Sequence, residues 1–419
     1  MDCGPSGTMI AHRTSPVRVA AAVAAAIGMV SAAPTTKAAA VVRQAGCSGS
    51  SPPAVRLGYY GSWGANWTCH PTTPALLEAA GDSYTHLAWS FADVGPNLTL
   101  VPAATGDEAS YATFNTLKAT RPGLRTLIAV GGWAFNDDPV KRDRWTRMVA
   151  TEKTRRAFAA SAVEFITQHG FDGVDLDWEY PGAEDRAGRP EDRRNYVALV
   201  AEMKIAFNTA VVSGQEPLLT MAVPCGGPYL AAFDLVQLAK HLDWIGAMCY
   251  DLAGAWGPAP FTTGSHTNAT TIGTAVDAML ASGVPANKIV QGMASYGRAW
   301  TLTDPAACAS ERAPFCKASA AGRAGPCTAE AGALSIYEID YMLHGGGAGC
   351  GGGGGGALAK GTAAGSAWAI LDGDQFVSYD TTATAATKIA LAQERCMAGT
   401  MVWSINMADA KDLYGPAAA

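Results

Sequence analysis

The chain has 419 residues, of which 49% are hydrophobic and 16% are charged, a composition that excludes a disordered protein and fits a globular one. Its formal net charge is only −6 and it has no long basic run, which argues against nucleic acid or an anionic membrane as the main partner. A barrel domain of about 250–300 residues would fit within this length and leave room for an insertion.

Residues 1–40 are predicted to be a signal peptide. Two arginines precede an apolar run over residues 19–33, which is too short for a comfortable membrane span and has no polar face. An amphipathic or buried helix is the alternative. Cleavage could fall near Ala33 or after Ala40, and we favour Ala40 because a proline follows the first site. We therefore expect a secreted, extracellular protein in which residues 41–54 form a short leader.

Short apolar segments alternate with helical stretches along the rest of the chain. Eight segments are predicted as strands: 55–63, 85–94, 124–133, 171–180, 217–226, 242–251, 288–297 and 399–407. The helices predicted between them include 141–169, 193–213, 233–241, 271–282 and 384–395. Eight alternations imply a parallel sheet with right-handed crossovers, and eight strands close into a barrel. A doubly wound open sheet usually has fewer strands, so the predicted fold is an α/β protein with a (β/α)8 TIM barrel.

The connection between the seventh and eighth strands is out of proportion, at about a hundred residues. Residues 301–375 contain four cysteines and the glycine-rich run 345–356, and most of them follow no helical pattern. We predict a small inserted subdomain over 301–375, with a flexible glycine loop and with disulfides whose pairing the sequence does not specify. The barrel would then comprise residues 55–300 and 376–419.

Ten cysteines fit an oxidising compartment. Loss of Cys3 with the signal peptide would leave nine, so at least one thiol would be free or would pair with another chain. Cys225 and Cys249, on the fifth and sixth strands, are expected to be small buried hydrophobic residues. The chain has no C-x-x-C pair, and its seven histidines, including His169, show no ligand spacing. We therefore expect no metal site and no cofactor.

The segment FDGVDLDWEYPG, residues 171–182, places four carboxylates among large hydrophobic residues: Asp172, Asp175, Asp177 and Glu179. Side chains alternate along a strand, so the last three share one face while Asp172 points the opposite way. Inside a closed barrel the three acids would climb toward the C-terminal mouth, where barrel enzymes place their chemistry. Neighbouring carboxylates resist simultaneous ionisation, so at least one of them should keep a proton at neutral pH.

Glu179, the longest of these acids and the nearest to the mouth, is the predicted proton donor. Asp177 would hydrogen-bond toward it, and Asp175 would tune the pair from below. The alternatives are a solvated acidic strand face and a calcium site. A solvated face would not carry Val174 and Leu176 on its back, and a calcium loop needs turn-forming spacing that this segment lacks.

The same segment reproduces the D-x-x-D-x-D-x-E pattern of the family 18 glycoside hydrolases, the chitinases and their relatives, and the chain resembles this family over residues 55–410. Further segments that resemble the family, in the family's order, are THLAWSFADV, AVGGW, MCYD, GMASYGRAWTL, GALSIYEI and MVWSINM. The resemblance implies an α+β insertion after the seventh strand. It also implies cleavage of β-1,4 bonds between N-acetylglucosamine units, with retention of the anomeric configuration.

By this resemblance the substrate's own acetamido oxygen, and not a second carboxylate of the protein, attacks the sugar and forms an oxazolinium intermediate. Glu179 would protonate the leaving oxygen and later activate water. Asp177 would orient the acetamido group, supported by Asp175, and Tyr250 would donate its hydroxyl to the acetamido carbonyl.

The resemblance also implies a binding set that combines aromatic faces for the apolar sides of sugars with polar groups for their hydroxyls. These residues are Tyr59, Phe91, Gly132, Trp133, Tyr180, Met248, Asp251, Tyr296, Arg298, Met401 and Trp403. Trp403 would form the floor beneath the distorted sugar. Three further tryptophans, Trp63, Trp67 and Trp256, could extend the cleft or pack under loops.

Some of these assignments have alternatives. Met248 and Met401 could equally be core residues, and Tyr60 competes with Tyr59. The family's usual S-x-G-G reads A-V-G-G here, so Ala129 removes a hydroxyl beneath the acidic strand.

Two other functions compete with a chitinase: a chitin-binding lectin without catalysis, and an endo-β-N-acetylglucosaminidase that acts on glycoprotein glycans. Such lectins typically lack the proton donor, whereas Glu179 is present, and the segment of strand seven together with the insertion favours a chitinase. We expect a monomer that binds chitin or chitooligosaccharides and neither nucleic acid nor, after signal cleavage, a membrane.

Overall fold

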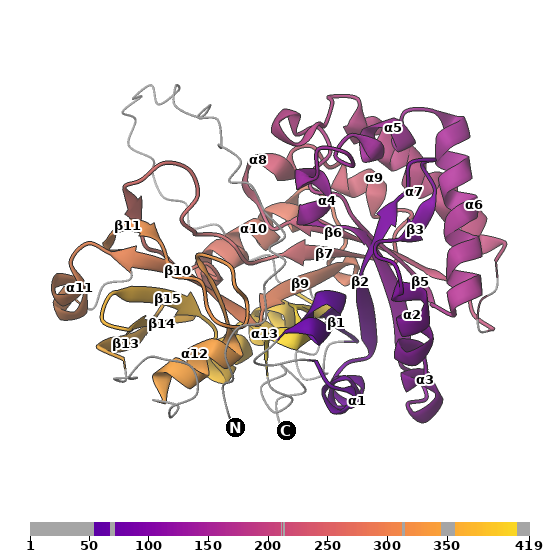
Figure 1. Ribbon diagram of the computed structural model, residues 1–419. Helices are drawn as coiled ribbons and strands as arrows, with labels where there is room; N and C mark the ends of the chain where they lie inside the picture. The colour runs from indigo at the N-terminus through magenta and orange to yellow at the C-terminus, as the bar shows by residue number, and fades with distance from the viewer. Residues whose placement is uncertain are drawn as a thin grey trace.

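The computed structural model describes residues 54–67, 72–210, 212, 214–311, 315–344 and 357–408. The predicted signal peptide, the leader up to residue 53 and the glycine-rich run lie outside these residues. The described chain forms a parallel barrel and, beside it, a smaller antiparallel sheet (Figure 1). None of the helices in these ranges combines the length and hydrophobicity that a membrane span requires.

Eight parallel strands close into a barrel, because the first strand pairs with both the last strand and the second. In spatial order they are β1 (Val55–Gly61), β16 (Gly399–Trp403), β9 (Ile289–Ala294), β7 (Trp244–Met248), β6 (Leu218–Pro224), β5 (Gly173–Asp177), β4 (Arg125–Gly131) and β2 (His86–Val94). A short strand, β3 (Leu100–Pro102), pairs antiparallel with β2. Each predicted strand segment contains one of the eight, so the predicted TIM barrel is confirmed.

Helices connect the strands of the barrel, and most of them cover its outside. They are α1 (Pro74–Ser83), α2 (Asp107–Asn115), α3 (Leu117–Thr120), α4 (Trp133–Asp137), α5 (Arg144–Val149), α6 (Glu152–His169), α7 (Asp192–Asn208), α8 (Gly227–Leu230), α9 (Leu235–Leu238), α10 (Ala269–Ala281) and α13 (Thr382–Glu394). Short 3-10 turns are η1 (Ser62–Asn66), η2 (Glu184–Arg186), η3 (Ala286–Lys288) and η4 (Ile405–Met407). The stretch predicted as one helix over 141–169 is two helices, because Thr151 caps a new one by accepting a hydrogen bond from the backbone N–H of Thr154.

The second sheet lies beside the barrel, on the left of Figure 1. Its strands, in spatial order, are β13 (Ala359–Ala363), β14 (Ser366–Leu371), β15 (Gln375–Tyr379), β10 (Tyr296–Leu302), β11 (Lys317–Ala321) and β8 (Phe261–Thr262), and β12 (Ala333–Ser335) pairs with β10. Helices α11 (Pro305–Glu311) and α12 (Ile336–Leu343) accompany it. The sheet reaches beyond residues 301–375 at both ends and recruits β8 from the segment after β7.

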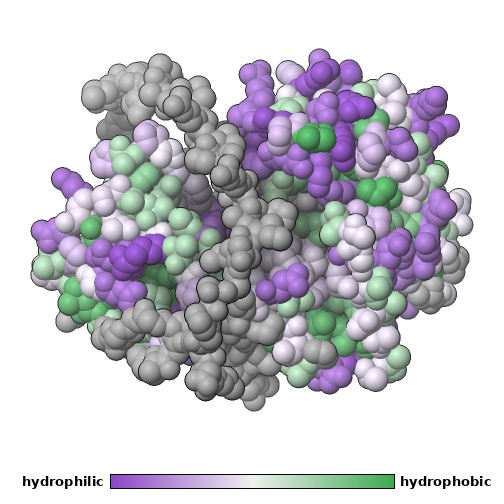
Figure 2. Space-filling view, in the orientation of Figure 1, coloured by the Kyte–Doolittle hydropathy of each residue, from purple (hydrophilic) through white to green (hydrophobic). Residues whose placement is uncertain are grey.

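A short connection and a buried ion pair join the barrel to the second sheet. Ser295 alone separates β9 from β10. A fully buried ion pair links Lys388 of α13 to Asp380 after β15, and the Lys388 Nζ also donates to the carbonyl of Gly365 at 2.8 Å. The barrel and the second sheet therefore share a packed boundary. On the face shown in Figure 2, the surface around α4 and α5 is mostly hydrophilic, and hydrophobic residues form small separate patches.

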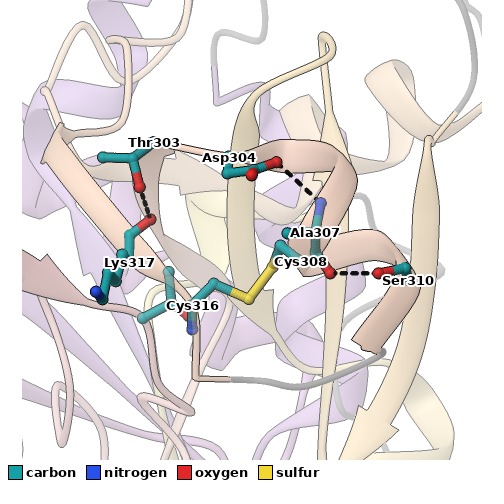
Figure 3. The surroundings of a disulfide bond; sticks show 8 residues. Thr303, Asp304, Ala307, Cys308, Ser310, Cys316 and Lys317 are labelled. Atoms are coloured by element: carbon teal, nitrogen blue, oxygen red, sulfur yellow. Dashed lines mark hydrogen bonds between the residues drawn. A yellow bond between two sulfur atoms is a disulfide. The ribbon is translucent and has the colours of Figure 1, made fainter.

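A disulfide between Cys308 and Cys316 ties α11 to the start of β11 (Figure 3). Around it, the Asp304 carboxylate accepts from the backbone N–H of Ala307 at 2.9 Å, which begins α11. Two more cysteines, Cys327 and Cys396, are also disulfide-bonded. Three of the four cysteines in the predicted insertion are therefore oxidised, and the fourth lies outside the described residues.

The prediction for Cys225 and Cys249 is wrong, because these two residues form a disulfide with a Cα–Cα separation of 4.7 Å. The register of the barrel explains the pairing. Pro224 of β6 lies opposite Met248 of β7, so the next residue on each parallel strand is a cysteine at the same level. The bond joins neighbouring strands at the C-terminal mouth of the barrel.

Candidate active site

The strand β5 alternates as the sequence predicts. Leu176 and Trp178 belong to the outer hydrophobic cluster, where Trp178 stacks on Trp145 with ring centroids 5.5 Å apart. Asp172 also points away from the lumen and pairs with the Lys118 Nζ at 2.9 Å. The alternate positions, Asp175, Asp177 and Glu179, therefore face the inside of the barrel.

Asp175 lies deepest in the lumen and is held from two sides. The Tyr59 hydroxyl donates to its Oδ2 at 2.8 Å, and the Thr220 hydroxyl donates to its Oδ1 at 2.5 Å. Burial raises the pKa of Asp175, and these two hydrogen bonds oppose that rise only in part. Ala129 lies opposite Asp175 in the ladder and has no hydroxyl, so the hydroxyls that Asp175 accepts from belong to Tyr59 and Thr220.

Asp177 and Glu179 lie two residues apart at the mouth, and both residues are buried. Burial, the Glu179 charge and the Asp175 charge raise the pKa of Asp177 well above its ordinary value. Burial also raises the pKa of Glu179 to about 7, against the opposing effects of a Tyr180 hydrogen bond and of the Arg186 charge. The Asp177 Oδ1 is buried without a hydrogen-bond partner among the described residues. The pair can therefore hold a proton at neutral pH, and the Asp177 Oδ1 is available to accept a hydrogen bond from a ligand.

Tyr250 follows β7 and faces the same acids. Burial and the charges of Asp177 and Glu179 raise the pKa of its hydroxyl well above the ordinary value. Tyr250 therefore remains a neutral hydrogen-bond donor at neutral pH.

A second polar cluster borders Tyr250. Asp251, in the left-handed region with φ 57°, accepts from the Arg298 Nε and Nη2 at 2.7 and 2.6 Å and from the Tyr296 hydroxyl at 2.6 Å. Burial alone would raise the pKa of Asp251, but the Arg298 charge and hydrogen bonds overcome it and hold the pKa well below its usual range. His266, fully buried, lies behind the pair with its Nδ1 3.7 Å from the Asp251 Oδ1.

We expect Asp251→Asn to lower the free energy of unfolding by about 2 kcal/mol. The figure is below the about 3–5 kcal/mol typical of a broken buried pair, because a third of the Asp251 side chain is exposed. Denaturant unfolding at pH 7 measures the loss. Asp143→Asn, which breaks the pair with Arg147 in which both side chains are more than half exposed, is the matched control and should lower stability by at most about 0.5 kcal/mol. Equal losses in the two variants would contradict this account.

Aromatic rings gather at the C-terminal ends of β1, β2 and β16. Trp403 stacks on Phe91 with centroids 5.5 Å apart and lies 5.6 Å from the ring of Tyr59. Trp63, from η1, extends the group: its ring stacks on Phe91 at 6.2 Å and is 38% exposed. The site thus joins paired carboxylates and polar donors to an aromatic wall, which is the combination that carbohydrate sites use.

The family model for glycosyl hydrolases family 18 matches residues 55–408. The chain belongs to glycosyl hydrolases family 18.

Curated proteins and solved structures agree with this membership. The chain is 33% identical to Chitotriosidase-1 of Mus musculus over 79% of the chain and 68% of that protein, and 32% identical to Chitinase A1 of Niallia circulans over 70% of the chain and 42% of that protein. A Group IV chitinase of Ostrinia furnacalis superposes with a TM-score of 0.72 at 28% identity, covering 86% of this chain and 95% of that structure. A family 18 chitinase of Cycas revoluta in complex with (GlcNAc)4 gives 0.68 at 26% identity, covering 84% and 96%. The chain therefore spans less than half the length of the bacterial relative.

The remaining residues expected in this family 18 site fall into different environments. Met401 is fully buried in the barrel interior with Tyr59, whereas Met248 is half-buried. Gly132, with φ 80°, has no room for a side chain, because an added Cβ would lie 2.6 Å from the ring of Phe91. Its backbone N–H donates to the Asp177 carbonyl at 2.8 Å, so the loop after β4 is attached to the acidic strand.

The tryptophans that the sequence left undecided differ as well. Trp63 joins the aromatic wall, as described above. Trp256 is 55% exposed and lies over Arg298, with 5.6 Å from the guanidinium carbon to the ring centroid. Trp67 is half-buried and nothing in its surroundings decides its role. His169 packs against Phe165 with ring centroids 4.5 Å apart.

One buried residue beside the acids has no counterpart among the predicted site residues of this family 18 protein. Arg186, only 5% exposed, contacts Trp133, Asp137 and the backbone of Glu179. It lies seven positions after Glu179 in an irregular loop, where no periodicity indicates which way a side chain points. Within the described residues, no group of three or more His, Cys, Asp or Glu side chains is placed to hold a metal ion.

Proposed function

We propose that this family 18 protein is a secreted, monomeric chitinase that hydrolyses β-1,4 bonds of chitin and chitooligosaccharides with retention of configuration. The observation that carries the proposal is the buried Asp177–Glu179 pair, which keeps a proton at neutral pH beside an aromatic wall. A general acid must be protonated at the working pH, and pyranose rings pack on aromatic faces. The apolar run at residues 19–33 supports secretion.

In the first step the carbonyl oxygen of the substrate's acetamido group attacks the anomeric carbon. The glycosidic C–O bond breaks, and the leaving oxygen takes the proton of Glu179. The product is a cyclic oxazolinium that carries a positive charge. The unpartnered Oδ1 of Asp177 accepts from the acetamido N–H and stabilises this charge, while Tyr250 donates to the acetamido oxygen.

In the second step Glu179, now a carboxylate, takes a proton from water as the water oxygen attacks the anomeric carbon. The bond to the acetamido oxygen breaks, the ring opens, and the sugar leaves with its original β configuration. Glu179 is protonated again, so the cycle closes without a covalent bond to the protein. Trp403 supports the distorted sugar throughout.

The pH dependence of kcat/KM follows from the pKa of Glu179. This pKa is about 7, so the acid form that protonates the leaving group disappears as the pH rises through 7. We expect kcat/KM on a fluorogenic chitobioside to fall tenfold per pH unit above that point. A basic limb near pH 5, the range of an ordinary glutamate, would contradict the assignment.

Tyr59→Phe removes one of the two hydroxyls that hold Asp175. A hydrogen bond to a charged group contributes about 1.5–3 kcal/mol, so we expect kcat to fall by roughly tenfold or more while KM changes little. Tyr60→Phe is the matched control, because Tyr60 packs in the outer cluster on Phe114 and should leave kcat unchanged. Initial rates on chitohexaose measure both variants.

The proposal is tested by the products of chitohexaose with their anomers resolved early in the reaction. A first-formed β-anomer supports retention, and a first-formed α-anomer overturns it. A chitin-binding lectin would bind the oligomer without cleaving it. Cleavage of high-mannose glycans in preference to chitohexaose would instead indicate an endo-β-N-acetylglucosaminidase.

A further inference from the structure

Arg186 lies at the end of η2, and one guanidinium reaches two loops at the mouth of the barrel. Its Nε donates to the carbonyl of Glu179, in the loop after β5. Its Nη2 donates to the carbonyl of Trp133 at 2.7 Å, and its Nη1 pairs with Asp137 at 2.9 Å, both in α4 after β4. We call this set of contacts the clamp. The Arg186 side chain is 5% exposed and that of Asp137 is 56% exposed, so Arg186 is the buried partner of the ion pair and Asp137 the exposed one.

The same guanidinium also covers the indole of Trp133. Its central carbon lies 3.6 Å from the ring centroid, which is the separation of two stacked planes. Trp133 is nevertheless 50% exposed, so the rest of its surface is open to solvent. An exposed tryptophan without such a partner would sample several rotamers, and binding a sugar would have to order it.

The loop that carries Arg186 is held on its other side as well. The Tyr229 hydroxyl donates to the neighbouring Asp185 at 2.9 Å, and the Tyr229 ring stacks on Tyr180 with centroids 4.6 Å apart. The loop is therefore fixed toward α8 whether or not Arg186 is present. What Arg186 adds is the connection in the other direction, between Trp133 and the backbone of Glu179.

We propose that Arg186 is a positioning residue, which holds the Trp133 sugar platform at a fixed place relative to the proton donor Glu179. The inference rests on the hydrolysis proposed above and names the residue that aligns the sugar next to the cleaved bond with the acid. Arg186 acts through Trp133 and through the Glu179 backbone, and it does not itself touch the reacting atoms.

The charge of Arg186 also affects the pKa of Glu179, which a residue that only holds Trp133 in place would not do. The charged and titratable groups around the Glu179 carboxyl are Asp177 of β5, Tyr180 and Arg186 of its own loop, Asp137 of α4, and Tyr250 and Asp251 after β7. Arg186 is the cation among them that lowers the pKa of Glu179. Its removal should therefore move the basic limb of kcat/KM upward, by about one pH unit.

Two substitutions separate the mechanical effect from the charge. Arg186→Lys keeps the charge but loses the planar stack and the fork of donors. We expect it to raise the KM for chitotetraose about threefold to tenfold with kcat and the pH profile almost unchanged. Arg186→Gln loses both, so the KM should rise and the basic limb should shift upward. Arg147→Gln replaces an exposed arginine of α5 that pairs with the exposed Asp143; it is the control and should change neither.

Binding without turnover gives an independent readout. Calorimetric titration of chitotetraose into Glu179→Gln should show the same loss of affinity when Arg186→Lys is added, and this loss should vanish when Trp133 is already alanine. If Arg186→Gln does not fold, Asp137→Asn tests the clamp from its exposed side and should raise the KM in the same direction. An active wild type whose Arg186→Lys variant binds and cleaves as before overturns the clamp. A wild type that does not cleave chitohexaose overturns the proposed function instead.

Discussion

Glu179→Gln is expected to reduce kcat on chitohexaose by about 10³–10⁴-fold, with binding of chitotetraose retained. Glutamine has nearly the same shape as the protonated acid but has no acidic proton to give to the leaving oxygen, and general acid catalysis contributes up to about 10⁴-fold. The side chain is buried at the mouth, so no water replaces it directly. Steady-state rates and calorimetric binding measure the two effects separately.

Glu184→Gln is the matched control, because Glu184 is an exposed glutamate of the same loop. It should leave kcat unchanged. Thermal unfolding adds a second check. The pKa of Glu179 is raised from 4.5 to about 7, so the folded state binds more protons than the unfolded state between these pH values and stability falls as the pH rises. Glu179→Gln should therefore be more stable than wild type at pH 8, by about 3 kcal/mol at most. Undiminished activity in this variant would refute the acid assignment.

Asp177→Asn should reduce kcat by about 10²–10³-fold, because it removes the negative charge that faces the oxazolinium. It should also move the basic limb of kcat/KM to lower pH by about one unit. Asp177 and Glu179 repel each other when both are ionised, so the neutral amide lets Glu179 lose its proton more easily. The rate and the pH profile are measured on the same fluorogenic chitobioside.

Asp143→Asn, at an exposed position before α5, controls for the loss of one carboxylate elsewhere and should leave the profile in place. The shift in pH is the discriminating result for Asp177→Asn. A variant that loses activity while its basic limb stays at wild-type pH would indicate that Asp177 positions the substrate but does not share a proton with Glu179.

Much of the fold could be predicted from the sequence, because the alternation of side chains along each strand indicates which face is buried. The acids of β5 and the hydrophobic residues between them fall on opposite faces as the two-residue period requires. The division of the 141–169 stretch into α5 and α6 was missed, although Thr151 followed by Thr154 is a capping signal. The disulfide between Cys225 and Cys249 was missed because it depends on the register between β6 and β7, which neither strand encodes alone.

The candidate site shows where such reasoning ends. Residues on strands, such as Asp175 and Trp403, could be placed by parity and by resemblance. Arg186 could not, because its direction depends on a loop that is shaped by contacts with α4 and α8. The non-proline cis bonds before Phe91 and Tyr180 leave no mark in the sequence either.

The most direct test of the account is a titration of the Glu179 carboxyl itself, by infrared difference spectroscopy of wild type against Glu179→Gln from pH 4 to pH 9. The account predicts a protonated carboxyl band that is absent from the variant and that disappears with a midpoint near pH 7. A Glu179 that is already fully ionised at pH 6 would contradict it, because the protein would then have no proton to deliver to the leaving sugar.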